Sequence, residues 1–195
     1  MDNTQGQEGG GRGRIDVVLG PMFSGKSSEL LRRLRRQTIA GRPAVCYKFA
    51  ADTRYSAADC ATHDLLTFAA VPLYDLDTDL VDSLAPRTLI GIDEGQFFAG
   101  LAQFACYAAA AGHAVVVAAL DGDSEQQPFA EIPGLVAAAD TVCKLSAVCG
   151  VCGDTAPFTR RRPAAGQDQA MPRPRIAIGG SEQYQAVCRR CLGGH

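Results

Sequence analysis

The sequence contains no apolar run close to the roughly 20 residues that a membrane-spanning helix needs. Its first residues, MDNTQGQEGGGRGR, also lack the apolar core of a signal peptide. We therefore expect a cytoplasmic protein without a membrane partner. The same polar, glycine-rich composition predicts a disordered tail over residues 1–13.

An excess of charge of one sign is missing as well. The formal net charge of the 195 residues is −2, which gives no general attraction to nucleic acid or to an anionic membrane. We therefore expect no stable nucleic-acid partner. The sequence has no internal repeat, and its length allows one sizeable domain and a small module.

A glycine-rich segment is the strongest motif, because residues 20–27, GPMFSGKS, fit G-x-x-x-x-G-K-[ST]. In such a loop, backbone N–H groups surround phosphate oxygens, the lysine reaches the β and γ phosphates, and the hydroxyl binds Mg²⁺. An apolar strand at 15–19 precedes it and a helix at 26–38 follows, which favours this interpretation over a simple strand–helix turn. The candidate phosphate-binding residues are Gly20, Pro21, Met22, Phe23, Ser24, Gly25, Lys26, Ser27 and Ser28.

A second motif ends the apolar strand expected over residues 88–94, where Asp93 and Glu94 are adjacent. In phosphate-loop proteins, an aspartate at this place holds the Mg²⁺ of the nucleotide. Side chains alternate along a strand, so the two carboxylates cannot share one role. The pattern predicts that Asp93 faces the metal, together with Ser27, and that Glu94 takes a proton from the nucleophile.

Strands alternate with helices along most of the chain, which predicts a right-handed, parallel α/β sheet. Polar segments follow two strand ends, at 51–56 and 121–129, where open sheets of this kind bind ligands. Asp52 and Arg54 could face such a site, or they could form a local pair in a solvent-exposed loop. The further strands are expected at 44–48, 65–68, 114–120, 141–147 and 175–178, and the further helices at 76–84, 97–111 and 133–139.

Four of the eight cysteines form two CxxC pairs, Cys149/Cys152 and Cys188/Cys191. Four thiolates make the tetrahedral ligand set of structural Zn²⁺, with no open position for catalysis, although a redox CxxC is an alternative. The 35 residues between the pairs exceed the usual spacing of roughly 15–20 and predict a long loop. We expect the other cysteines to be small core residues; these are Cys46, Cys60, Cys106 and Cys143.

Taken together and in this order, these segments resemble the type II thymidine kinases, the zinc-containing deoxynucleoside kinases. The resemblance covers residues 14–192 and rests on six segments: 20–30, 52–56, 90–98, 118–122, 144–149 and 179–188. It implies a P-loop NTPase (RecA-like) domain over 14–147, a zinc-binding lasso domain over 148–192 and a short tail at 193–195. It further implies phosphoryl transfer from ATP to the 5′-hydroxyl of thymidine, a homotetramer, and inhibition by dTTP.

The resemblance also assigns roles by position. Glu94 corresponds to the general base, Asp93 and Ser27 to the Mg²⁺ positions, Lys26 to the phosphate lysine, and Arg54 to an arginine near the transferred phosphoryl group. Thymine is held mainly by backbone groups of a lasso at about 159–179. The implied substrate-binding residues are Met22, Asp52, Arg54, Glu94, Phe97, Leu120, Phe129, Thr159, Ala177, Ile178 and Tyr184.

Two features depart from the family pattern. Residues 123–127, DSEQQ, stand where an aromatic and basic continuation is common, and the lasso is longer than usual. Two other functions compete with the kinase: a phosphate-loop ATPase that acts on nucleic acid through a zinc ribbon, and an interaction module with a vestigial nucleotide site. The near-neutral charge disfavours the first, and the complete set of lysine, serine and acidic residues disfavours the second.

Overall fold

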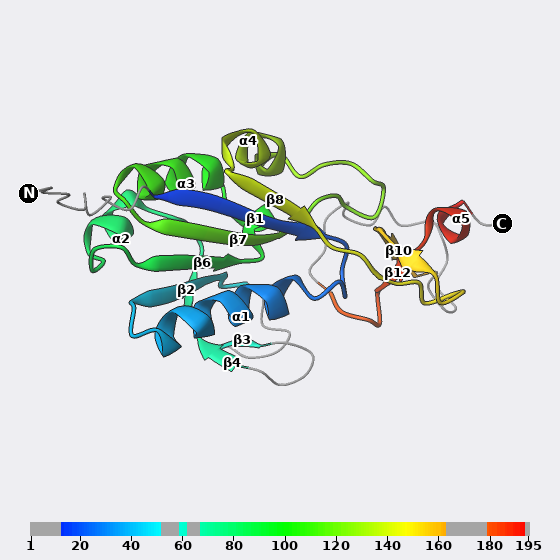
Figure 1. Cartoon of the computed structure of the whole chain (residues 1–195). Coiled ribbons are helices and arrows are strands. Elements are labelled where there is room, and N and C mark those ends of the chain that lie inside the picture. The colour runs from blue at the N-terminus through cyan, green and yellow to red at the C-terminus, as the bar shows by residue number, and fades with distance from the viewer. Residues whose placement is uncertain (1–12, 52–58, 62–66, 163–178, 194–195) are drawn as a thin grey trace, which may run out of the picture.

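A six-stranded parallel sheet forms the centre of the molecule in a computed structural model that describes residues 13–51, 59–61, 67–162 and 179–193 (Figure 1). The strand order is β5-β2-β6-β7-β1-β8. This confirms the α/β class and the parallel sheet expected from the alternating pattern. The strands are β1 (Arg14–Gly20), β2 (Ala44–Phe49), β5 (Val71–Leu73), β6 (Leu89–Asp93), β7 (Ala114–Leu120) and β8 (Thr141–Lys144).

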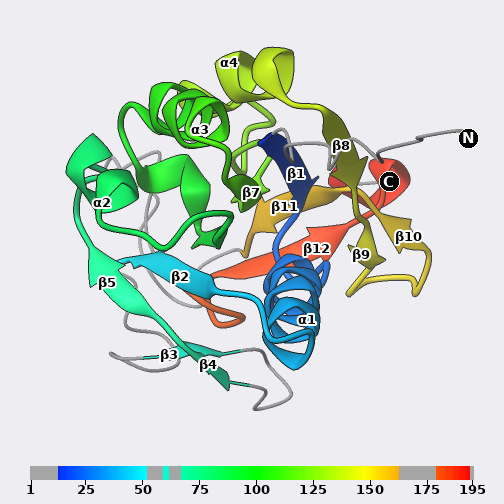
Figure 2. The same ribbon diagram turned by 60° about the vertical axis from the view of Figure 1, so that its left-hand side comes forward.

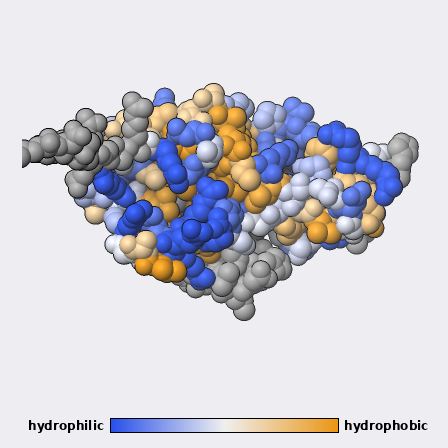
Figure 3. All heavy atoms as spheres, viewed as in Figure 1, coloured by the Kyte–Doolittle hydropathy of each residue, from blue (hydrophilic) through white to orange (hydrophobic). Residues whose placement is uncertain are grey.

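Helices cover both faces of this sheet, which explains why β1, β6 and β7 are almost continuously apolar. Helix α1 (Lys26–Ile39) lies on one face, and α2 (Thr78–Asp82), α3 (Leu101–Ala110) and α4 (Glu131–Ala138) lie on the other (Figures 1 and 2). Figure 3 shows hydrophilic residues gathered over α1, which exposes an arginine-rich face and buries its leucines Leu30, Leu31 and Leu34.

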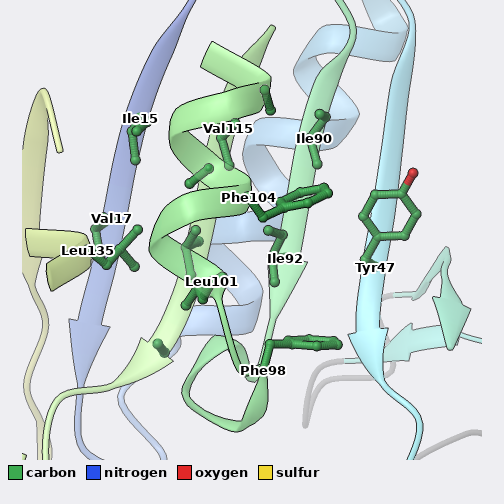
Figure 4. Packing of buried hydrophobic residues seen from close by; sticks show 14 of the residues in the cluster. Ile15, Val17, Tyr47, Ile90, Ile92, Phe98, Leu101, Phe104, Val115 and Leu135 are labelled. Atoms are coloured by element: carbon green, nitrogen blue, oxygen red, sulfur yellow. The ribbon is translucent and has the colours of Figure 1, made fainter. Parts of the chain in front are cut away.

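The larger core lies between the sheet and the α3 side (Figure 4). Phe98 and Leu101 are completely buried there, and the ring of Phe104 meets that of Tyr47 edge to face with centroids 6.4 Å apart. Burial of such side chains contributes roughly 1.5–3 kcal/mol each to stability. This core supports the carboxyl ends of β6 and β7, where candidate functional residues lie.

Two sequence-based boundaries were wrong, each for a local reason. The helix expected at 97–111 is a 3₁₀ turn, η1 (Gly95–Phe97), followed by α3, because Gly100 adopts φ 69° and interrupts the helix. The strand expected at 141–147 divides into β8 and β9 (Ala147–Val148), and β9 joins a different sheet. Of the strand expected at 65–68, residues 65 and 66 lie outside the described residues, and β4 (Thr67–Ala69) pairs antiparallel with β3 (Asp59–Ala61).

The last part of the described chain has its own small core. Strand β9 pairs with β10 (Thr155–Ala156), and β11 (Phe158–Arg161) pairs with β12 (Tyr184–Val187), followed by the short helix α5 (Arg189–Leu192). Val187 and Ala156 are fully buried there, and Cys149, Cys188 and Cys191 line the same cluster, whereas Cys152 is exposed. Two-stranded sheets of this size are only marginally stable alone, so they depend on the small core that they share.

The cysteines outside those pairs do not all behave as expected. Cys46 is completely buried, as predicted. Cys106 and Cys143 are exposed, which contradicts the core assignment: Cys106 lies on the outer side of α3, and Cys143 lies on β8, an edge strand whose four residues are all exposed. Among the residues that the structure describes, no helix is long and apolar enough to cross a membrane.

Candidate active site

The glycine-rich loop connects the carboxyl end of β1 to the amino end of α1. Gly20 has φ 149°, and a Cβ atom there would lie 2.6 Å from the carbonyl oxygen of Leu145 and 2.8 Å from Ser24 Oγ. Gly25 has φ 83° immediately before α1. Both glycines are therefore required by the path of the backbone, as the motif predicts. The amino end of α1 is a favourable place for an anion.

Lysine and serine side chains fold back onto this loop. Lys26 Nζ donates to the carbonyl oxygen of Pro21 at 2.7 Å, and Ser24 Oγ donates to the same oxygen at 2.8 Å. Pro21 is buried, whereas Phe23 is 40% exposed and has φ 66°. The ammonium group of Lys26 thus lies over the loop, where it can neutralise phosphate charge.

Asp93 and Ser27 meet although 66 residues separate them in the sequence. Ser27 Oγ donates to Asp93 Oδ1 at 2.9 Å, and the Asp93 side chain is buried at the end of β6. The strand β7 lies between β1 and β6, so parallel strands bring both groups to one edge of the sheet. A hydroxyl and a carboxylate oxygen are hard ligands of the kind that Mg²⁺ accepts beside nucleotide phosphates.

Glu94 has a partner different from that of its neighbour Asp93. It is half-buried, its backbone adopts φ 54° and ψ 40°, and its Oε2 accepts a hydrogen bond from Gln96 Nε2 at 2.5 Å. A left-handed conformation is uncommon for a residue with a side chain and often marks a functional position. The two carboxylates therefore have different environments, but the cause differs from the expected alternation along one strand: β6 ends at Asp93, and Glu94 lies in the turn that follows it.

Aromatic side chains line the same end of the sheet. The ring of Phe97 lies 5.3 Å from that of Phe49 and 6.2 Å from that of Phe129, measured between centroids. Leu120, half-buried at the end of β7, packs against the core that contains Phe129. Three of the predicted substrate residues, Phe97, Leu120 and Phe129, therefore belong to one apolar region.

Two further predicted residues come from the C-terminal part of the chain. The backbone N–H of Met22 donates to Thr159 Oγ1 at 2.9 Å, which joins the glycine-rich loop to β11. Tyr184 on β12 is buried, its hydroxyl oxygen accepts from Arg161 at 3.2 Å, and the guanidinium lies 5.6 Å from its ring centroid. The predicted residues Asp52, Arg54, Ala177 and Ile178, and most of the lasso, lie outside the described residues.

The sequence motifs predict no role in the kinase site for Gln96, Phe49 or Arg161, although all three contact candidate site residues. Gln96 does lie in the segment 90–98 that carries the family resemblance, which marks it as a candidate. The helix expected at 97–111 begins immediately after it, so the local pattern gives Gln96 no contact with Glu94. The other two lacked a distinguishing pattern.

A cavity of about 170 Å³ lies beside Thr159, between the loop 121–128 and Pro157. The loop is a closed turn, because Asp123 Oδ1 accepts from the backbone N–H groups of Glu125 and Gln127, at 2.8 and 2.9 Å. The buried side chain of Asp123 thus organises the turn from within, in the segment 123–127 that departs from the family pattern.

The four paired cysteines converge as predicted. The Sγ atoms of Cys149, Cys152, Cys188 and Cys191 lie within 4.8 Å of one another. A tetrahedral zinc ion with Zn–S bonds of about 2.3 Å would space its sulfurs about 3.8 Å apart. The sulfurs of Cys152 and Cys188 are 3.7 Å apart, so the geometry fits zinc.

The electrostatics of this cluster also suit a cation. Burial raises the pKa of Cys149, but hydrogen bonds from surrounding backbone and side-chain groups outweigh it and lower the pKa to about 6. The pKa of Cys191 is raised to about 12. The largest cause is a hydrogen bond with Cys152, and burial and the neighbouring thiols add to it. Four adjacent thiols cannot all ionise alone, and a divalent cation supplies the missing charge.

Comparison with known proteins identifies the family. A sequence model described as thymidine kinase matches residues 13–192. The cytosolic thymidine kinase of Homo sapiens is 46% identical over 180 residues, covering 92% of this chain and 73% of that protein. That of Gallus gallus is 42% identical over 186 residues, covering 95% and 80%.

A viral relative is similar along nearly its whole length. The thymidine kinase of raccoon poxvirus is 41% identical over 179 residues, covering 92% of this chain and 96% of that protein. The family match includes the glycine-rich loop, the acidic strand end and both cysteine pairs, which the structure brings into two compact clusters. The chain belongs to the thymidine kinase family.

Proposed function

We propose that this protein transfers the γ-phosphoryl group of ATP to the 5′-hydroxyl of thymidine, giving dTMP and ADP. The observation that carries this proposal is the contact between Ser27 Oγ and Asp93 Oδ1, beside Glu94 and at the end of the glycine-rich loop. This contact supports the proposal because it joins the start of α1, which follows the glycine-rich loop, to the acidic end of β6. Membership of the family supplies the substrate class.

In this reaction, the 5′-oxygen of thymidine forms a bond to the γ-phosphorus while the bond from that phosphorus to the β–γ bridging oxygen breaks. Glu94 accepts the proton of the hydroxyl as transfer proceeds. Lys26 and the backbone N–H groups of residues 20–28 hold the phosphates, which positions the donor and offsets its charge. Arg54 is proposed to add a positive charge at the transferred group.

Two metal ions have separate roles in the proposal. Mg²⁺ would be held by Ser27 and Asp93, and when bound it neutralises charge on the phosphates. Zn²⁺ would be held by the four clustered cysteines, where it stabilises the small C-terminal sheets instead of taking part in chemistry. This division corresponds to a P-loop NTPase domain of the RecA-like type over residues 14–147 and a zinc-binding lasso domain over 148–192.

The nucleoside is proposed to bind against the apolar region of Phe97, Leu120 and Phe129, supported by their shared position at the carboxyl ends of β6 and β7. Met22, Thr159 and Tyr184 would complete its wall, with Asp52, Ala177, Ile178 and lasso backbone groups around the base and sugar. From the family resemblance alone we also propose a homotetramer and inhibition by dTTP.

A nucleoside panel tests the proposed function. The purified protein is incubated with ATP, Mg²⁺ and thymidine, deoxyuridine, deoxycytidine or deoxyadenosine, and nucleoside monophosphates are quantified. Formation of dTMP supports the proposal. ATP hydrolysis that requires DNA, without dTMP, would support a nucleic-acid ATPase instead, and an absence of turnover would support a binding module.

A further inference from the structure

Gln96 connects the candidate base to the backbone of a neighbouring strand. Its side chain is buried, with 6% of the residue exposed. Its Nε2 donates to Glu94 Oε2 at 2.5 Å, and its Oε1 accepts from the backbone N–H of Leu120 at 2.9 Å. The amide therefore bridges the turn after β6 and the last residue of β7.

The second of these contacts determines the first. A backbone N–H can only donate, so the Gln96 atom that faces Leu120 must be the amide oxygen. The NH₂ group must then face Glu94, where a carboxylate oxygen accepts its hydrogen bond. The strand β7 thus sets the orientation of the amide, and the amide orients the carboxylate.

The backbone around this bridge has little room to adjust. Glu94 itself adopts the left-handed conformation, with φ 54°. A Cβ atom on Gly95 would lie 2.6 Å from Val117 Cγ1 on β7, so the turn packs directly against that strand. Because one end of the bridge is the backbone of Leu120 on β7 and the turn that carries Glu94 packs against the same strand, the bridge orients the Glu94 carboxylate.

We propose that Gln96 is a positioning residue that holds the Glu94 carboxylate in the orientation needed to accept the substrate proton. This inference rests on the proposed function, in which Glu94 is the base. Gln96 does not itself touch the reacting atoms in this account. Loss of an outer hydrogen-bonding partner or a shift of a catalytic group by about 1 Å typically lowers activity by roughly 10- to 100-fold.

Two substitutions separate the two hydrogen bonds. Gln96→Met keeps the size of the side chain but removes both bonds, whereas Gln96→Glu keeps an acceptor for Leu120 and places a second carboxylate against Glu94. We expect each to lower kcat by roughly 10- to 100-fold with the KM for ATP unchanged. Gln103→Met, on the exposed side of α3, is the matched control and should retain wild-type kcat.

A double substitution distinguishes positioning from general support of the fold. If Gln96 acts through Glu94, Gln96→Met should change kcat little once Glu94→Gln is present. An equal loss in both backgrounds, or wild-type kcat for Gln96→Met beside an impaired Glu94→Gln, would overturn the inference and leave the proposed function standing. Full activity of Glu94→Gln would instead remove the proposed base, and the inference with it.

Discussion

The backbone N–H of Met22 and the hydroxyl of Thr159 form a buried hydrogen bond of 2.9 Å between groups 137 residues apart in the sequence. One lies in the glycine-rich loop and the other on β11, in the C-terminal part of the chain. Thr159 is 4% exposed, so neither group can easily turn to water when the bond is lost. This contact ties the order of the glycine-rich loop to that of the region that contains the four clustered cysteines.

Replacing Thr159 by valine should therefore weaken both stability and nucleotide binding. The substitution leaves the Met22 N–H buried without its acceptor, at a cost of about 1–3 kcal/mol. We expect a lower melting temperature and a higher KM for ATP, measured by thermal unfolding and steady-state kinetics. Thr159→Ser should preserve most of both, because the hydroxyl remains. Thr155→Val, at an exposed position of β10, is the matched control, and an equal effect there would contradict the assignment.

Glu94→Gln should lower kcat by at least about 10²-fold, because the amide cannot accept the proton of the 5′-hydroxyl. Thymidine binding should persist, since the amide keeps the size and polarity of the side chain. Single-turnover kinetics and equilibrium binding of thymidine measure the two effects separately. Glu125→Gln, at an exposed position in the loop 121–128, serves as a control. Near-wild-type kcat for Glu94→Gln would show that another group is the base.

Deoxycytidine should be a poor substrate compared with thymidine. A buried edge that pairs with the N3–H and carbonyl groups of thymine leaves some of its own groups unpaired with cytosine, whose donor and acceptor pattern differs. Because such pairing discriminates strongly, we expect kcat/KM for deoxycytidine to be lower by at least about 10²-fold. Competition assays with both nucleosides provide the measurement, and comparable values would contradict recognition of this edge.

The sequence predicted the elements that carry strong local patterns. Motif and periodicity predict three features that the structure contains: the glycine-rich loop between β1 and α1, the apolar strands β1, β6 and β7, and the convergence of the four paired cysteines. Each of these depends on residue types with few alternatives: a glycine at positive φ, a continuous buried run, or paired thiols. Local sequence therefore contained the information needed for them.

Tertiary contacts decided what the sequence could not show. The apolar sequence of residues 97–111 predicts one helix. In the structure, however, Phe98 has an extended backbone and is completely buried, and Gly100 adopts a positive φ just before α3 begins. Likewise, Cys143 sits in an apolar run yet is exposed, because β8 is an edge strand. The role of Gln96 depends on Leu120, 24 residues away, which no local pattern reveals.

Serine at Cys188 should release the metal and loosen the C-terminal region. Removing one of four ligands from a structural zinc site weakens binding, and the small core around Val187 then loses its support. We expect less than one zinc per chain by metal analysis, together with a lower melting temperature. Cys143→Ser is the control, because this exposed thiol lies on β8 and is not part of the cluster. A full complement of zinc in Cys188→Ser would disprove the ligand assignment.

The acid stability of α1 should depend on Glu29. The pKa of the Glu29 carboxyl is lowered from 4.5 to about 2. The main cause is the hydrogen bonding from Arg32; burial opposes this shift, and a hydrogen bond from Arg33 adds to it. Since the folded state binds this proton less readily than the unfolded state, Glu29 stabilises the fold fully above about pH 4.5 and loses this contribution between 4.5 and 2.

Glu29→Gln should therefore lower the melting temperature at pH 7, and the difference from wild type should shrink as the pH falls below 4.5. The effect should amount to a few degrees at most, because Arg32 is largely exposed and water screens the ion pair. Thermal unfolding of both proteins between pH 7 and pH 3 provides the comparison. Any loss of metal at low pH affects both proteins alike and therefore cancels in the difference between their melting temperatures. A difference that grows on acidification would have the wrong sign for a carboxyl whose pKa is lowered by folding.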